Sequence, residues 1–254
     1  MTHTRTSSGI LLALALAAIV ALAQPAHLLA QEEERPTGVT AGLHLQLVFP
    51  RGDFEKKVDN LGFGANIDLG YSFPGLPVTV GLEGGYVVYG SKTYKTQFSE
   101  FVPVSVEVTA TNSIVPLHLF CRLQPHYGDF RPYAEGLLGM NVLTTSSSVR
   151  NLNTDEEIAG DTKHSDVAFS YGAGGGVMVR VWSGTAPDQS SGRNHPMEVF
   201  VDARVRYLYG GTAKYYTDNA VYQLPNGAVK FDDSKLTSSK TDYITAMLGV
   251  VVRL

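Results

Sequence analysis

The stretch TDYITAMLGVVVRL, residues 241–254, decides the fold because its side chains alternate between two kinds along its whole length. Successive side chains of a β-strand point to opposite faces, so residues two apart share a face. One face of this strand is apolar and comprises Ile244, Ala246, Leu248, Val250, Val252 and Leu254. The other face is mixed and comprises Tyr243, Thr245, Met247, Gly249, Val251 and Arg253. The stretch therefore predicts a strand between an apolar environment and a polar one that accepts a charge.

Residues 1–30 have the features of an export signal. Arg5 is the only arginine, lysine, aspartate or glutamate among them, and it precedes one apolar run, ILLALALAAIVALA at 10–23. This run is shorter than the roughly 18–20 apolar residues that a spanning helix needs. Cleavage is expected after Ala30, with Ala23 as the alternative. Residues 1–30 are therefore predicted to be a signal peptide that directs export.

The rest of the chain consists of a charged lead-in, QEEERP at 31–36, and residues 37–254, which are predicted to form one barrel domain. After the signal the formal charge is −5, because removal of Arg5 changes the total of −4 by one unit. This acidic balance gives no support to nucleic-acid binding, which requires a basic face. The sole cysteine, Cys121, excludes an internal disulfide and any zinc site made of cysteines.

The alternation of the last strand recurs along the whole predicted domain. The predicted strands are 39–49, 63–73, 78–88, 115–123, 133–142, 167–181, 198–209 and 243–254. Most of them reach the roughly 9–11 residues that a tilted strand needs to cross a bilayer. An even strand number, with compact turns at 74–77 and 125–130 and longer connections between them, is typical of outer-membrane barrels. We expect an all-β fold, an eight-stranded antiparallel up-and-down transmembrane β-barrel, with ten strands as the alternative.

The longer connections are expected to be external loops, and they lie at about 50–62, 90–105, 144–165 and 211–240. The last of these is interpreted as a hairpin that extends the final two strands above the membrane, or as two further membrane strands. The connection at 183–196 is long for a periplasmic turn. Trp182, just before it, counts to the inner face by alternation.

A soluble barrel or sandwich would show the same alternation with its apolar face turned inward. The composition of the mixed face distinguishes the two, because five carboxylates there match five arginines. These residues are Asp68, Glu83, Glu135, Glu198 and Asp202 with Arg122, Arg180, Arg204, Arg206 and Arg253. In a narrow barrel such charges are expected to pair across the lumen and fill it. The alternative is a narrow pore in which Arg180, Arg204 and Arg206 favour anions.

On these residues the chain resembles the small outer-membrane β-barrel proteins of Gram-negative bacteria, the OmpX/OmpW-like and porin-family group. The resemblance rests on SIVPLHLFCRL at 113–123, RPYAEGLLGMNV at 131–142, FVDARVRYLYG at 200–210 and the last strand. It covers most of residues 37–254. These motifs indicate membership of a barrel family and not a particular activity.

The resemblance also implies an assembly signal in the last strand. In the family this signal ends in a hydrophobic, usually aromatic residue, with another hydrophobic residue two positions before it and a glycine five before the end. Leu254, Val252 and Gly249 hold these places, with aliphatic side chains where the family has aromatic ones. Recognition of this strand by the barrel-assembly machinery is what the resemblance implies.

Other chemical motifs have ordinary structural explanations. The glycine-rich segment 172–176 lacks the strand-then-helix context of a nucleotide-binding loop, and glycines in a barrel strand relieve crowding. Arg51-Gly52-Asp53 spells an integrin-type tripeptide, but Gly-Asp is also common turn chemistry. His44 and His118 point inward without a spaced partner, and His164 precedes a serine in a loop. No catalytic residue, cofactor or metal site is predicted.

The sequence thus predicts an integral protein of the outer membrane with a plugged polar lumen and no enzymatic activity. Its expected role is structural or one of surface interaction through the external loops. The alternatives are a narrow porin-like channel for small solutes and an outer-membrane lipid-modifying enzyme. The expected partners are outer-membrane lipid, the barrel-assembly machinery and an unidentified extracellular ligand, and not nucleic acid. A monomer is expected.

Overall fold

The structure is a computed structural model, and it describes part of the chain. The described residues are 38–58, 60–97, 105–125, 127–151, 157–187, 194–216, 221–223, 229–232, 234 and 236–254. The predicted signal peptide and lead-in lie outside them. Residues Pro36–Leu254 belong to one compact unit. Among the described residues, no helix is long and apolar enough to cross a membrane.

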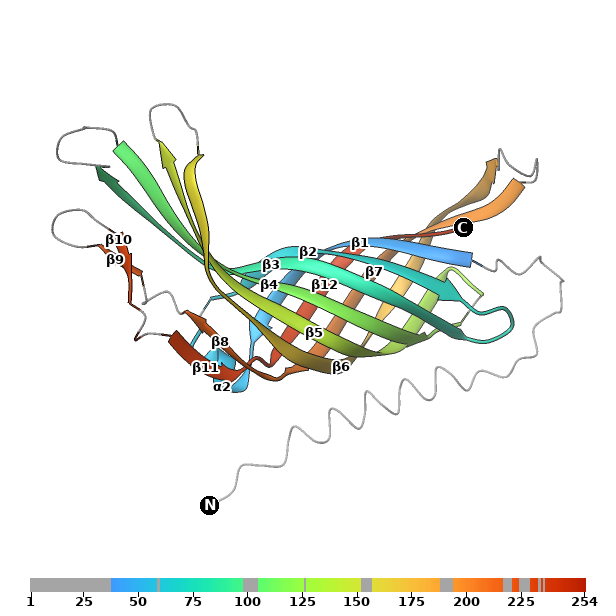
Figure 1. Cartoon of the computed structure of the whole chain (residues 1–254). Coiled ribbons are helices and arrows are strands. Elements are labelled where there is room, and N and C mark those ends of the chain that lie inside the picture. Colours follow the sequence, from blue (N-terminus) through green and yellow to red (C-terminus); the bar gives the residue numbers. More distant parts are fainter. Residues whose placement is uncertain are drawn as a thin grey trace, which may run out of the picture. The chain divides into compact units, whose positions relative to one another are not determined.

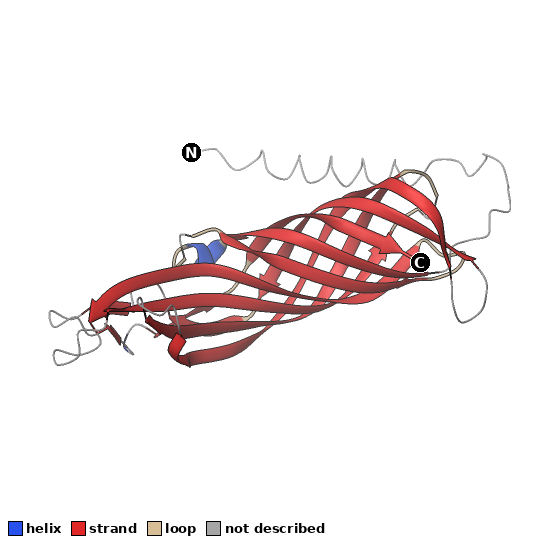
Figure 2. Ribbon diagram, turned by 90° about the horizontal axis from the view of Figure 1, so that it is seen from above, coloured by secondary structure: helices blue, strands red, loops and turns tan. Residues whose placement is uncertain are grey.

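Eight strands close into one antiparallel barrel (Figure 1). They are β1 (Gly38–Pro50), β2 (Gly62–Ser72), β3 (Val78–Gln97), β4 (Ser105–Leu123), β5 (Phe130–Asn151), β6 (Glu157–Pro187), β7 (Asn194–Gly210) and β12 (Tyr243–Arg253). From β1 to β7, consecutive strands pair with one another. Strand β7 also pairs with β12, and β12 pairs with β1 to close the barrel. The strands are steeply tilted (Figure 2). The predicted fold class is confirmed, including the number of barrel strands.

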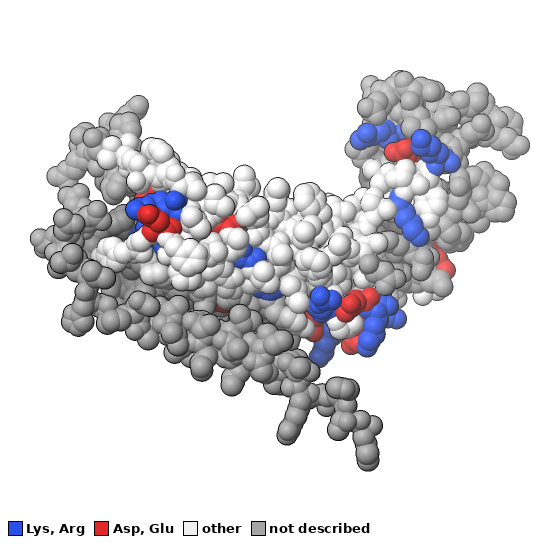
Figure 3. Space-filling model, turned by 180° about the vertical axis from the view of Figure 1, so that it is seen from behind, with Lys and Arg blue, Asp and Glu red and all other residues white. Residues whose placement is uncertain are grey.

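The apolar faces of the strands point outward and the mixed faces point into the barrel. On β1, the side chains of Leu43 and Leu45 are each 61% exposed, whereas His44 between them is 0% exposed. The last strand behaves as predicted, because Leu248 and Val250 are exposed and Arg253 is buried. On the face shown in Figure 3, the middle of the barrel carries few charged side chains. An apolar belt of this kind suits lipid and would be costly in water.

Two of the predicted external loops are strands over much of their length. The pairing of β3 with β4 continues out to Gln97 and Ser105, and the pairing of β5 with β6 continues to Arg150 and Glu157. Both hairpins project beyond the barrel (Figure 1). The predicted loops at 90–105 and 144–165 are therefore wrong in extent. The apolar alternation ends where these strands leave the lipid, but threonine, valine and tyrosine still favour strands there.

The predicted loop at 50–62 contains α2 (Gly52–Glu55), which turns back toward the barrel. Phe54 on this helix is fully buried and Val58 is 7% exposed, although the segment around them is polar. The backbone N–H of Arg51 donates to the carbonyl of Asp242 at 2.8 Å, which fastens the start of the helix to the segment before β12. The segment therefore closes over the barrel and does not extend freely outward.

The segment 211–240 forms the predicted hairpin and not two further barrel strands. It contains β8 (Thr212–Tyr216) paired with β11 (Leu236–Lys240), and β9 (Val221–Gln223) paired with β10 (Val229–Phe231). Because β8 follows β7 directly and β11 directly precedes β12, the hairpin extends the final two barrel strands. The N–H of Gly211 donates to the carbonyl of Phe169 at 2.7 Å, which continues the pairing of β7 with β6 by one row. Neither pair belongs to the barrel sheet, so the ten-stranded alternative is wrong.

Trp182 lies on the outer surface and not on the predicted inner face. The register of β6 against β7 shifts between Arg180 and Trp182, which leaves Val181 as an extra residue. Such a β-bulge reverses the alternation that follows it. Val181 and Trp182 are consequently both exposed, at 59% and 49%.

Candidate functional site: the barrel interior

The interior has an apolar layer at the end opposite the C-terminus. We call it the mouth cluster; its residues are Val48, Phe54, Val58, Val87, Tyr89, Ile114, Leu143, Ala168, Leu208, Ala213, Tyr215 and Tyr243. Phe54 stands at its centre, with its ring edge-on to those of Tyr89 and Tyr215 at 5.5 and 5.4 Å between centroids. Because outer-membrane barrels have short periplasmic turns and long extracellular loops, this end is the extracellular mouth.

Below the mouth cluster, Arg204 on β7 is the centre of a first group of charges. Its Nε donates to Asp202 at 2.7 Å, and its Nη2 donates to Asp68 on β2 at 3.0 Å. His44 lies between the same two carboxylates, with Nδ1 3.3 Å from Asp68 and Nε2 3.0 Å from Asp202. The hydroxyl of Tyr133 donates to Asp202 at 2.7 Å. This group ties β1, β2, β5 and β7 together across the lumen.

A second group, nearer the mouth cluster, is built around Arg206, two residues further along β7. Its Nε donates to Glu135 at 2.6 Å and its Nη1 to Glu83 at 2.8 Å. Arg122 also donates to Glu135, at 3.0 Å, and His118 Nδ1 lies 3.4 Å from Glu83. All of these side chains are nearly or fully buried. Two carboxylates, two arginines and a histidine thus share one compact set of contacts.

The arginines of this region also lie against aromatic rings. The guanidinium carbon of Arg122 is 4.4 Å from the ring centroid of Tyr133 and 5.0 Å from that of Phe120. Cation–π contacts of this kind add favourable electrostatics where water is excluded. They also fix the plane of the guanidinium, and so help to direct its N–H groups at Glu135.

A third group lies at the periplasmic end, around Glu198. Arg131 donates to this carboxylate at 2.9 Å and Arg180 donates to it at 2.7 Å, while Arg253 Nη1 lies 3.9 Å from it. Arg180 also pairs with Asp129. A smaller apolar cluster lies near this group and consists of Tyr133, Met178, Phe200 and Val251, with Arg131 stacked over the ring of Phe200 at 4.4 Å.

All ten charged residues that the sequence assigned to the inner face point into the barrel, and each has an oppositely charged neighbour. The specific partners were not predicted. Arg131 also points inward, although it was not among the predicted residues. It lies four residues before Glu135 on β5, so alternation alone places both side chains on the same face. The interpretation that His44 and His118 have no spaced partner is wrong, because their carboxylates lie on other strands.

Two glycines make room for the charged groups. Gly249 lies opposite His44 in the register, and a Cβ atom on it would lie 2.4 Å from the imidazole ring. Gly174 lies opposite Arg206, where a Cβ atom would lie 2.6 Å from that side chain. Gly249 thus has a packing role in the folded barrel, and Gly174 confirms that the glycines of 172–176 relieve crowding. Val252 and Leu254 of the implied assembly signal lie on the outer face.

The remaining candidates of the sequence lie outside this interior. The charged side chains of the Arg51-Gly52-Asp53 tripeptide are exposed but pair within α2 and its first flanking residues. Arg51 donates to Glu55 at 3.3 Å, and Asp53 accepts from Lys56 at 2.8 Å, a hydrogen bond that lowers the pKa of the Asp53 carboxyl. His164 lies edge-on to Tyr216. Among the described residues, no three His, Cys, Asp or Glu side chains are placed to hold a metal ion.

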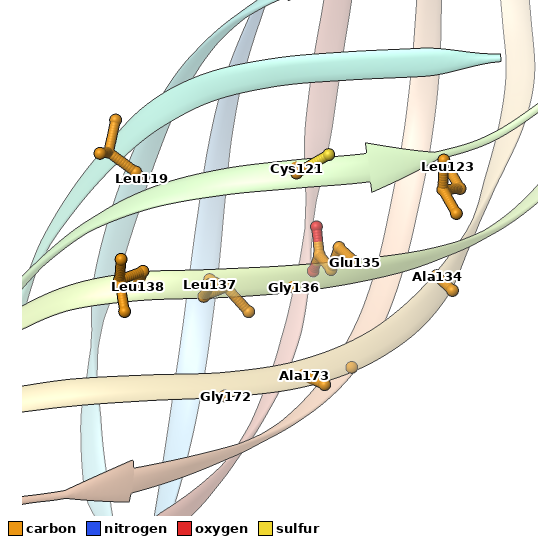
Figure 4. Close-up of a pocket in the computed structure, with 11 residues that line it drawn as sticks. Leu119, Cys121, Leu123, Ala134, Glu135, Gly136, Leu137, Leu138, Gly172 and Ala173 are labelled. Carbon is orange, nitrogen blue, oxygen red and sulfur yellow. The ribbon is translucent and has the colours of Figure 1, made fainter.

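The outer surface has a hollow of about 640 Å³ over β4, β5 and β6 (Figure 4). Small residues form its floor, because Cys121 pairs with Gly136 and Gly136 pairs with Ala173 across the three strands. Leu119, Leu123 and Leu138 stand around it. The floor residues belong to the outward faces of their strands, so the hollow faces the lipid side.

The network predicts a large stability cost for the loss of one arginine. Arg204→Met leaves Asp68 and Asp202 buried without a cation, so the free energy of unfolding should fall by about 3–5 kcal/mol. The matched control is Arg51→Met, whose exposed pair should contribute about 0–1 kcal/mol. Urea titration of the barrel folded in detergent measures both. Equal, small losses for the two variants would contradict a buried ion-pair network.

Comparison with known proteins agrees with the architecture. The family model for the outer membrane protein beta-barrel domain matches residues 11–188. No curated protein matches the chain significantly in sequence. Among solved structures, Neisserial surface protein A from Neisseria is 13% identical, with a TM-score of 0.38, and the alignment covers 85% of this chain and 96% of that one.

Two further solved structures show similar values. The attachment invasion locus protein Ail of Yersinia pestis is 15% identical, with a TM-score of 0.33 and coverage of 86% of this chain and 97% of that chain. A major outer membrane protein of Thermus thermophilus is 14% identical, with a TM-score of 0.31 and coverage of 84% and 99%. The family match spans well over half of the sequence. The chain therefore belongs to the outer membrane protein β-barrel domain family and is a protein of the outer membrane.

Proposed function

We propose that this protein is a closed barrel that does not conduct solutes and that acts as a membrane scaffold for its extracellular surface. The proposal rests on the layers of side chains that fill the lumen one after another. The mouth cluster comes first, and the groups around Arg206 and then Arg204 follow toward the periplasm. An eight-stranded barrel is only wide enough for its own side chains to fill it.

The charges themselves support a plug more than a pore. An ion in transit needs wall charges that are free to coordinate it and then release it. Here Arg204 and Arg206 each bind two carboxylates at 3.0 Å or less. A passing anion would have to break these contacts and leave buried carboxylates unpaired, at a cost of several kcal/mol per ion. The narrow-channel alternative is therefore disfavoured.

The extracellular part supports a role in surface interaction. There β3, β4, β5 and β6 continue as a four-stranded sheet beyond the barrel. Its described surface is rich in hydroxyl groups, which pair with one another as in Thr93 with Thr109 at 3.2 Å and Thr144 with Ser165 at 3.4 Å. Lys92 and Lys95 lie on its outer strand, where lysine discourages uncontrolled pairing with other chains. Such a sheet offers a rigid polar platform to an extracellular ligand.

We also propose that outer-membrane lipid surrounds the apolar belt, that the barrel-assembly machinery recognises β12, and that the protein is monomeric. A catalytic role is not proposed. The inward-facing histidines are in contact with carboxylates inside the filled lumen, where a lipid substrate would have no access. His118, for example, lies 3.4 Å from Glu83.

The closed lumen predicts electrical silence. Purified barrel that is shown to be folded, when inserted into a planar bilayer, should give no discrete conductance steps. Phe54→Ala should open the mouth cluster and still give no steps, because the ion-pair groups remain below it. Cleavage by trypsin at Lys56 and Lys57 reports the release of α2 in this variant. Reproducible steps from the unmodified protein would contradict the proposal and favour a channel.

The platform role predicts a separate effect on the cell surface. Replacement of residues 92–110 by an Asn-Gly turn shortens the β3–β4 hairpin where Ser91 pairs with Thr111. Cells that carry this variant should attach less to polystyrene and to one another than cells with the full-length barrel. The matched control is Arg51→Met, which alters an exposed charge outside the sheet. Unchanged attachment, with equal surface amounts of barrel, would count against the platform.

A further inference from the structure

The hairpin between β6 and β7 is unlike the other two connections at the periplasmic end. The β2–β3 and β4–β5 connections are short, at 73–77 and 124–129. By contrast, β6 and β7 remain paired for six more rows beyond the bulge, from Trp182 with Val199 to Pro187 with Asn194. At about 3.3 Å per residue this ribbon extends roughly 20 Å. It stands out beside the C-terminus of the barrel (Figure 1).

The outer edges of this ribbon have no paired strand among the described residues. Strand β5 leaves β6 at the pair Phe130–Val179, and β12 leaves β7 at the pair Arg253–Glu198. From Gly184 onward, β6 therefore pairs with β7 alone. An isolated two-stranded ribbon is marginally stable in water, and its edges present unpaired N–H and C=O groups. This edge is thus a template for one more strand.

Contacts at the base of the ribbon fix the direction in which it leaves the barrel. Arg180 connects the last barrel row of β6 to Glu198 on β7 and to Asp129 in the adjacent turn. The backbone N–H of Arg180 also donates to the carbonyl of Asp129, at 2.7 Å. The bulge at Val181 follows at once, and bulges set the direction of a strand. The ribbon consequently leaves the barrel at a defined angle.

The free edge of β6 carries no charged side chain. Natural edge strands are protected by charged residues, above all lysine, and also by proline, bulges and short length. The extracellular edge strand of this same protein has Lys92 and Lys95 within the sequence GSKTYKTQ at 90–97. The periplasmic edge, WSGTAP at 182–187, has no charge and ends at Pro187. Between the bulge and this proline, Ser183–Ala186 therefore remains available for pairing.

An aromatic anchor lies at the start of the open edge. Trp182 is the only tryptophan of the chain and is 49% exposed. Its ring lies over Gly184, where a Cβ atom would be 2.5 Å from the ring. The ring therefore extends along the ribbon over Gly184, and about half of the residue's surface stays exposed. A partly exposed tryptophan beside unpaired backbone groups favours binding of another chain, because tryptophan is enriched among the interface residues that contribute most of the binding free energy.

We propose that the β6 edge over Ser183–Ala186 is a docking site for an extended polypeptide segment of a periplasmic protein. The segment adds to the ribbon as a third strand and packs one side chain against Trp182. Main-chain hydrogen bonds supply affinity in this mode of recognition, and the tryptophan supplies specificity. The site lies at the opposite end of the barrel from the extracellular platform, so this proposal is independent of the proposed function.

Hydrogen exchange tests the site while the partner is still unidentified. Exchange of the amides of residues 183–186 is measured by mass spectrometry in native cell envelopes and in the purified, detergent-folded protein. We expect exchange of the Ser183 and Thr185 amides, which point to the free edge, to be at least roughly tenfold slower in envelopes, because a third strand protects them. The β3 edge at 91–97 is the internal control and should not change between the two samples. Equal, fast exchange of residues 183–186 in both samples would overturn the proposal.

Enzymatic treatment of the envelopes identifies the class of the partner. Protection that survives muramidase and is lost after protease treatment of permeabilised envelopes supports a polypeptide. Protection that is lost with muramidase assigns the edge to a glycan and overturns the proposal. Slow exchange that persists in the purified protein shows that the chain covers its own edge, through residues 31–37 for instance, and also overturns it. Exchange of a tagged second copy into the protected complex would assign the edge to self-association instead.

A backbone substitution provides the matched variant. Thr185→Pro removes one N–H from the free edge and should abolish the envelope-specific protection of Ser183, whose N–H points to the same side of β6. Ser91→Pro places the same change in the extracellular hairpin and should leave that protection intact. Heat-modifiable migration on gels confirms that both barrels fold. If Thr185→Pro retains full protection, the edge is not paired with another strand and the proposal fails.

Discussion

A guanidinium that points into a narrow closed barrel must find its carboxylate there, because the lumen offers it little water. Much of the interior follows from this constraint. Arg204 on β7 reaches Asp68 on β2, and Arg206 reaches Glu83 on β3, so the pairs cross the lumen and do not follow one strand. Charges that would be costly alone become acceptable as a balanced set. The same set that stabilises the closed barrel also fills it.

The mouth cluster and the outer apolar belt follow the converse rule, that apolar side chains lie where there are no charges to pair with. Phe54 belongs to a polar segment but packs against Tyr89 and Tyr215, so apolar rings fill the region above the charges. On the outside, Leu43, Leu45 and their counterparts on other strands meet lipid. Period-two alternation thus performs two tasks at once, since one face inserts the barrel and the other assembles its interior.

Alternation predicted the strand number and the set of residues that share the mixed face. The balanced charges of that face then identified it as the inner face of a membrane barrel. Alternation fails as a predictor where a strand no longer lies between lipid and the barrel interior. Beyond the lipid both faces of a strand meet water, so β3 to β6 continue without an apolar signal. Phe54 and Val58 are isolated apolar residues in a polar segment, and their burial depends on rings from distant strands. The bulge at Val181 is a local irregularity that reverses Trp182. The partners of Arg206 depend on strand stagger, which one-dimensional spacing does not contain.

The free strand edges at the two ends of the barrel differ in length and in charge. The extracellular sheet is long and polar and carries Lys92 and Lys95 on its outer strand, which suits the proposed platform because lysine discourages edge-to-edge pairing. The periplasmic ribbon is short and uncharged along 182–187. In the function that we propose, the filled barrel between them joins the two surfaces mechanically and conducts no solutes.

A double-mutant cycle on Arg206 and Glu83 tests the central claim, that cross-lumen ion pairs hold the barrel closed. Arg206→Met, Glu83→Gln and the double variant are unfolded in urea from the same detergent. Contacting charges in a buried network should be coupled, and we predict a coupling energy of about 2 kcal/mol or more. Changes in unfolding free energy that add to within about 0.5 kcal/mol would contradict the claim, because they would show that the two side chains act independently.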